Sequence, residues 1–174
     1  MAAKKVSAKP NAAVLTPDRE TSSSDKDHTS LRLWLRLLTC TTIIENEVRG
    51  KLREEFETTL PRFDLMAQLE RAPKGLKMGE LSKRMMVTGG NVTGITDLLE
   101  KEGLVERAAD PNDRRAWLVR LTPAGRRGFA AMAAEHERWI VESFDALSGR
   151  EMATMAALLA RLKAHVRSLE ERDA

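Results

Sequence analysis

The chain has 174 residues, a net charge of +3 and one cysteine. This length allows one domain with appendages, and one cysteine excludes a disulfide framework within the chain. No apolar run approaches the roughly 20 residues that span a bilayer, and the N-terminal lysines precede no apolar stretch of the kind that secretory signals carry. We therefore expect a cytoplasmic protein. Because the net charge is only mildly positive, any affinity for a polyanion such as DNA must come from local clusters of basic residues.

Residues 1–28 are rich in Ala, Lys, Ser and Thr, so we expect a disordered N-terminal tail. A long helix is expected from Thr29 or Ser30 to about Thr58. Its first half carries a second apolar face that includes Trp34, and a helix that is apolar nearly all round has more than one neighbour. We therefore expect this half to meet a second subunit as well as its own core. The main stripe consists of Leu33, Leu37, Cys40, Ile44, Val48, Leu52 and Phe56.

A short helix over residues 62–71 is expected to follow Pro61, because proline suits the first turn of a helix. After a turn, a helix–turn–helix begins near Lys77. The side chains that its first helix is expected to bury are Leu81, Met85 and Met86.

The second helix of this pair has one apolar face and one face of small polar groups and bare backbone. Thr88 is placed to cap it, since a threonine hydroxyl can accept an unpaired backbone N–H. Val92, Ile95 and Leu99 have the spacing of a buried helix face. Gly103 is expected to end the helix in the left-handed conformation.

Two segments that alternate apolar and polar residues, 104–107 and 117–121, are typical of half-buried strands. The turn between them, 110–115, carries two arginines. A helix–turn–helix followed by a basic hairpin is a winged helix, so we predict a mainly α fold with a small β-hairpin wing (α+β). Such a second helix fits a DNA major groove, and a guanidinium on the hairpin fits the minor groove. Lys74–Gly128 holds eleven Lys and Arg against seven Asp and Glu, so the positive charge is concentrated there.

Pro123 is expected to open a helix that runs to about Phe144 and is weakened at Gly125 and Gly128. Ser148 then caps the last helix in a capping box. Apolar residues spaced three and four apart in that helix form a heptad seam. We expect this seam to join two subunits, with packing on its own domain as the alternative; a two-fold dimer matches a palindromic operator. The seam consists of Met152, Met155, Leu159, Leu162, Val166 and Leu169.

In order and spacing, these motifs resemble the MarR family of winged-helix transcription regulators over about residues 30–170. The resemblance implies a triangular homodimer in which terminal helices 29–60 and 123–172 interdigitate and 61–122 bind DNA. The segments that carry it are LPRFD at 60–64, MGELS at 78–82, NVT at 91–93, LEKEGLV at 99–105, DPNDRR at 110–115 and LTPAG at 121–125.

The resemblance also implies the DNA contacts. It places a minor-groove arginine at Arg115, next to Arg114, with Asp113 holding Arg115 in place. Larger polar or basic residues are common in the family where this chain has three glycines. Closer approach of the backbone to phosphates, or reliance on DNA shape, would replace side-chain readout there. The implied contacts of the recognition helix are Thr88, Gly89, Gly90, Asn91, Thr93 and Gly94.

Members of the family commonly repress neighbouring genes and release DNA when a small ligand binds. The segments 31–40 and 60–73 look most similar to members that sense aromatic acids or their coenzyme A thioesters. Arg36 or Arg62 would hold the carboxylate of such a ligand. The alternative is that Trp34 and its neighbours are only core and dimer seam, or that no effector exists. The expected crevice, between the first, second and fifth helices, is lined by Trp34, Arg36, Leu37, Leu38, Thr41, Arg62, Phe63, Met66 and Trp139.

Other chemistry is disfavoured, so we predict no enzyme, no metal and no cofactor. Cys40 lies on the apolar stripe and is expected to be structural rather than a peroxide sensor. His28, His136 and His165 lack zinc-ligand spacing. The competing hypothesis is a protein–protein docking or dimerisation module that does not bind DNA. The acidic residues Asp97, Glu100 and Glu102 are interpreted as a solvated face.

Overall fold

The computed structural model describes residues 29–110 and 113–172, except for the side chains of 113–116. The chain forms two compact units, Met1–Glu45 and Asn46–Ala174. The described part of the first unit is the beginning of helix α1 (Thr29–Phe56). Cys40, which the sequence analysis placed on the apolar stripe, is exposed in it.

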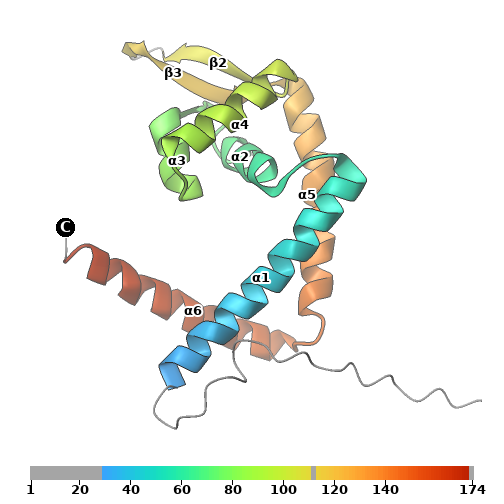
Figure 1. Cartoon of the computed structure of the whole chain (residues 1–174), viewed down its shortest axis with the longest axis vertical. Coiled ribbons are helices and arrows are strands. Elements are labelled where there is room, and N and C mark those ends of the chain that lie inside the picture. The colour runs from blue at the N-terminus through green and yellow to red at the C-terminus, as the bar shows by residue number, and fades with distance from the viewer. Residues whose placement is uncertain (1–28, 111–112, 173–174) are drawn as a thin grey trace, which may run out of the picture. The chain divides into compact units, whose positions relative to one another are not determined.

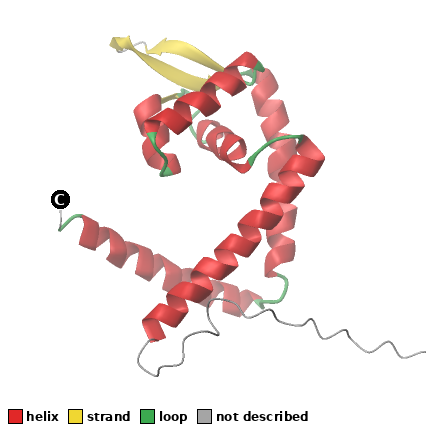
Figure 2. Cartoon of the chain, viewed as in Figure 1, coloured by secondary structure: helices red, strands yellow, loops and turns green. Residues whose placement is uncertain are grey.

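The second unit contains a helical domain with a small sheet, which confirms the predicted fold class (Figure 2). Helix α2 packs against α3, α4, α5 and β3, and so lies at the centre of the winged helix (Figure 1). The elements are α2 (Leu60–Glu70), β1 (Leu76–Lys77), α3 (Met78–Met85), α4 (Gly89–Lys101), β2 (Val105–Asp110), β3 (Asp113–Leu121), α5 (Pro123–Phe144) and α6 (Gly149–Glu170).

The sheet has three antiparallel strands in the order β1-β3-β2, whereas the sequence predicted only a hairpin. Leu76 of β1 pairs with Val119, and Val105 of β2 pairs with Leu121. A strand of two residues is too short to show the alternation that identifies strands. The extra strand fixes the start of α3 to the base of the wing.

The core of this unit is apolar and comes from every element of the winged helix. One polar side chain, Thr96, is fully buried on α4, where its hydroxyl donates to the carbonyl of Val92 at 2.8 Å. This local bond lets a polar residue occupy a helix face that the sequence pattern assigned to apolar residues. The fully buried apolar side chains are Leu52, Leu65, Met66, Leu69, Leu81, Val92, Leu99, Val105, Val119, Leu121 and Trp139.

Several predicted helix ends are confirmed. Gly103 follows α4 with φ of +71°. Ser148 and Glu151 form both halves of the predicted capping box. Met86, in contrast, is 88% exposed in the left-handed conformation at the end of α3, so the prediction that it is buried was wrong.

Helix α6 has no buried residue, although it carries the apolar seam. Its side chains at Met152, Met155, Leu159, Leu162 and Val166 are 37–45% exposed. None of the described helices is long and apolar enough to cross a membrane.

We expect Gly125→Ala to lower the free energy of unfolding by about 3 kcal/mol, the upper end of the cost of overpacking. A Cβ at Gly125 would overlap the carbonyl oxygen of Leu104, which cannot move without shifting the start of β2. Gly128→Ala is the matched control, because a Cβ there meets nothing within 4 Å. It should raise stability by up to about 1 kcal/mol through helix propensity. Urea unfolding of both variants checks this, and equal effects would contradict it.

Candidate nucleic-acid interface

The turn between α3 and α4 is fixed by local hydrogen bonds. The Ser82 hydroxyl donates to the carbonyl of Val87 at 2.6 Å, and the backbone N–H of Val87 donates to the carbonyl of Ser82 at 3.2 Å. Met86 supplies the left-handed residue that reverses the chain. The turn therefore sets the direction in which α4 leaves the protein.

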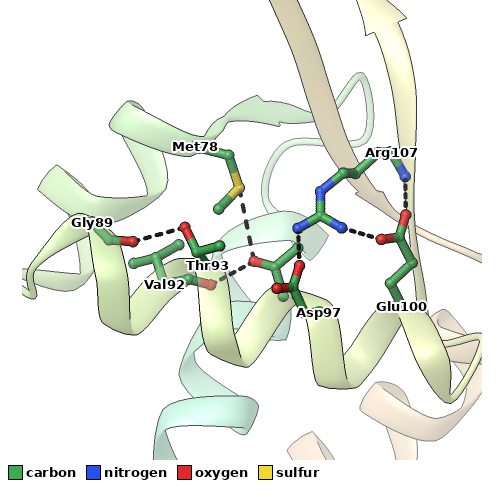
Figure 3. A network of polar contacts seen from close by, with 8 residues as sticks. Met78, Gly89, Val92, Thr93, Asp97, Glu100 and Arg107 are labelled. Atoms are coloured by element: carbon green, nitrogen blue, oxygen red, sulfur yellow. Dashed lines mark hydrogen bonds and ion pairs between the residues drawn. The ribbon is translucent and has the colours of Figure 1, made fainter.

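The N-terminal end of α4 presents an exposed surface to solvent. Val92, Thr96 and Leu99 are buried on the opposite face of the helix. The Thr93 hydroxyl donates to the carbonyl of Gly89 at 3.0 Å, which fixes its rotamer (Figure 3). The predicted recognition residues are all exposed and lie together here: Thr88, Gly89, Gly90, Asn91, Thr93 and Gly94.

The first turn of α4 lacks a side-chain cap. Thr88 occupies the N-cap position, but its hydroxyl makes no capping bond, so that part of the prediction was wrong. No acidic residue lies in the first turn either. Free N–H groups at a helix N-terminus, together with the helix dipole, favour an anion such as a phosphate.

Neither close packing nor backbone conformation requires glycine at the three glycine positions of α4. A Cβ at Gly89, Gly90 or Gly94 would meet nothing within 4 Å, and none of them has a left-handed backbone. Glycine inside a helix costs roughly 0.5–1 kcal/mol relative to alanine. The three glycines thus make the first turns of α4 less stable than alanines would, and the fold itself does not require them.

The wing is formed by β2 and β3. At the end of β2, next to the turn, Asp110 is buried, and its Oδ2 lies 3.3 Å from Lys77 Nζ on β1. The turn residues 111–112 and the side chains of Asp113, Arg114 and Arg115 lie outside the described residues. Their predicted role in the minor groove therefore stays a prediction.

An ion-pair network joins the wing to α4 (Figure 3). The guanidinium of Arg107 on β2 pairs with Asp97 and Glu100, and the backbone N–H of Arg107 donates to Glu100 Oε1 at 3.2 Å. The hydrogen bond that Arg107 donates to the Asp97 carboxylate raises the pKa of Arg107, so the guanidinium stays charged. Asp97 is exposed, in agreement with the predicted solvated face, and Glu100 is half-buried, but the sequence did not predict their pairing with Arg107. Sequence reasoning missed this network because its partners come from two elements.

Glu102 is also paired, with Arg62 on α2. Arg62 Nε is buried and has no hydrogen-bond partner in the described part of the chain. The two residues line a cavity of about 400 Å³. The other lining residues are Phe56, Glu57, Thr58, Met66, Leu104, Gly128 and Met132.

The predicted effector residues are divided between the two units. In the second unit, Phe63, Met66 and Trp139 are buried in the core, and only Arg62 and Met66 reach the cavity. Phe63 also packs against His136, with ring centroids 4.7 Å apart. The remaining five lie on α1 in the first unit: Trp34, Arg36, Leu37, Leu38 and Thr41.

No group of His, Cys, Asp or Glu in the described residues has the arrangement of a metal site. What the geometry offers instead is an exposed, uncapped helix start that follows a tight turn and lies beside a two-stranded wing. This combination defines a winged-helix DNA-binding protein.

Comparison with known proteins gives the family. The MarR family model matches residues 58–117. A MarR family transcriptional regulator from Silicibacter pomeroyi is 33% identical, with a TM-score of 0.70 over 83% of this chain and 99% of that one. A cysteine-to-serine variant of E. coli MarR complexed with operator DNA is 25% identical, with a TM-score of 0.70 over 80% of this chain and 99% of that one.

A curated relative is also similar in sequence. The uncharacterised HTH-type regulator YdgJ of Bacillus subtilis is 30% identical over 109 residues, which is 63% of this chain and 66% of that protein. The chain thus spans about two thirds of the length of this relative. The chain belongs to the MarR family of transcription regulators, and the prediction of a regulator rather than an enzyme is confirmed at the level of the family.

Proposed function

We propose that the protein binds a palindromic operator as a homodimer, with α4 in the major groove and the wing in the minor groove. It represses transcription until a small effector releases it. The observation that carries this proposal is the exposed, uncapped start of α4, whose N–H groups suit a phosphate. The solved complex of an E. coli MarR variant with operator DNA supports operator binding by this chain.

A second copy of the chain is the proposed partner of α6. The exposed seam adjoins an apolar groove of about 540 Å³ between the end of α5 and the start of α6. Large exposed apolar patches mark interaction sites. A two-fold dimer would present two α4 helices to two half-sites about 10 bp apart. The groove is lined by Ile140, Val141, Phe144, Asp145, Leu147, Met152, Met155, Ala156 and Leu159.

A gel-shift titration with the promoter upstream of its own gene tests operator binding. We expect saturable binding that weakens steeply with salt, because each phosphate contact releases counterions. A scrambled duplex of the same length is the control. No shift at low salt would favour the docking-module hypothesis. Reporter expression with and without the gene then separates repression from activation.

The proposed effector is a small aromatic acid or its coenzyme A thioester. The cavity beside Arg62 supports a carboxylate ligand, because Arg62 Nε is a buried donor without a partner in the described part of the chain. Trp34, Arg36, Leu37, Leu38 and Thr41 remain proposed contacts.

Thermal-shift screening with benzoate, phenylacetate and benzoyl-CoA tests the effector class. A ligand that binds only the folded state raises the melting temperature. Arg62→Met should abolish the shift while preserving the bulk of the side chain. If none of these compounds stabilises the protein, the effector class is wrong.

We expect Gly90→Ala and Gly94→Ala to have opposite effects on stability and on DNA binding. Each should stabilise the fold by roughly 0.5–1 kcal/mol, since the new methyl group meets nothing in the chain. Each should weaken operator binding if DNA approaches the bare backbone. Calorimetry and gel shifts measure the two effects, and unchanged affinity would argue against close approach at these positions.

A further inference from the structure

Arg107 lies on the face of the sheet that packs against the protein. It pairs in register with Val119, which is fully buried, and residues directly opposite in a ladder point to the same face. The next residues of β2 toward the tip, Ala108 and Ala109, are too small to reach a helix. Arg107 is therefore the long side chain with which β2 reaches α4 (Figure 3).

The two carboxylates that Arg107 pairs with are three residues apart on α4, so they lie on one helix face. The guanidinium presents its donors in a rigid fork, which allows it to hold both carboxylates at once. Its backbone N–H adds a third bond, to Glu100. Three bonds from one residue restrict both the distance and the direction between the strand and the helix.

We infer that Arg107 is a positioning residue that holds the wing in a fixed place beside the recognition helix α4. The major-groove and minor-groove elements then bind the operator as one rigid unit, without the entropy cost of ordering the wing. This inference rests on the proposed function. It assigns to Arg107 a role in DNA binding that requires no contact with DNA.

The same hairpin provides a matched control. Arg120 of β3 pairs with Glu106 of β2, with 2.7 Å between Nε and Oε1. Both side chains are about half exposed, and the pair ties the two strands to each other without reaching α4. Loss of this pair removes one ion pair from the wing but leaves the link to the recognition helix.

The decisive variant is Asp97→Ala/Glu100→Ala, because a positioning role and simple electrostatics predict opposite results. Removing two carboxylates from α4 makes the protein more positive, which by itself strengthens binding to a polyanion. Loss of the link to the wing should instead weaken operator affinity, by about fivefold or more. Arg107→Lys should weaken it as well, since an ammonium cannot reproduce the fork. Arg120→Met should leave affinity within about twofold.

A double-mutant cycle with Arg115→Ala separates positioning from a general loss of stability. If Arg107 acts through the wing, Asp97→Ala/Glu100→Ala should cost no further affinity once Arg115 is removed. Three outcomes would each overturn the inference. They are tighter operator binding by Asp97→Ala/Glu100→Ala, an equal loss of affinity from this variant with and without Arg115→Ala, and no effect of Arg115→Ala alone. A wild-type chain that fails to bind the operator would instead contradict the proposed function. Melting temperatures close to that of the wild type verify that all variants are folded.

Discussion

Met155→Glu/Leu159→Glu is expected to convert the protein to a monomer and to abolish operator binding at concentrations where the wild type is saturated. Both side chains belong to the exposed seam of α6 and line the apolar groove. Burying an unpaired carboxylate in an apolar interface costs several kcal/mol, and two-fold symmetry doubles the number of buried charges. We expect the dissociation constant of the dimer to rise at least about 100-fold.

Light scattering coupled to size-exclusion chromatography measures the oligomeric state directly. The monomer should keep its winged helix, because no residue of α6 is buried in the chain itself. Circular dichroism checks that the helices remain. Binding to the palindrome should be lost together with dimerisation, because a monomer gains no avidity from the second half-site.

The matched control is Ala157→Glu/Ala164→Glu, which adds the same charge to the opposite side of the same helix. Both alanines are exposed and lie away from the heptad seam. This variant should stay dimeric and bind DNA. If the seam variant also remained dimeric, another surface would have to join the subunits.

Arg115→Ala should weaken operator affinity roughly 5- to 150-fold, or about 1–3 kcal/mol. An arginine at the tip of a wing is attracted by the strong negative potential of a narrow minor groove. The slope of log affinity against log salt should fall by about one, since one phosphate-neutralising charge is lost. Titrations of the operator at several salt concentrations measure both quantities.

Arg120→Ala is the control for charge alone, because it removes the same charge from the same strand at a residue already paired with Glu106. We expect its effect on affinity to be small. An Arg115→Ala protein with wild-type affinity and salt slope would show that the wing does not enter the minor groove.

Features decided by neighbouring residues could be predicted from the sequence. Gly103 ends α4 and Ser148 caps α6 as expected, because both motifs depend on local backbone geometry. The exposed face of α4 was also predicted by local periodicity, since Val92 and Leu99 fix which face is buried.

Features decided by tertiary packing could not be predicted in this way. Strand β1 exists only because β3 pairs with it, and two residues carry no periodic signal. The Arg107 pairs depend on how the hairpin lies against α4, which spacing along the chain does not reveal. Met86 was assigned to the core by its apolar character, but the left-handed turn exposes it.

The open space around Gly89, Gly90 and Gly94 has a consequence for how this regulator can diverge. One nucleotide change turns any glycine codon into an arginine codon, and arginine is the side chain that most often reads guanine in the major groove. The Cβ of the new residue would meet nothing within 4 Å in the chain, and helix propensity would improve. With α4 in the major groove as proposed, new target sequences are within reach of single mutations whose Cβ the fold accommodates, so they escape one common cause of the stability loss that limits a gain of function.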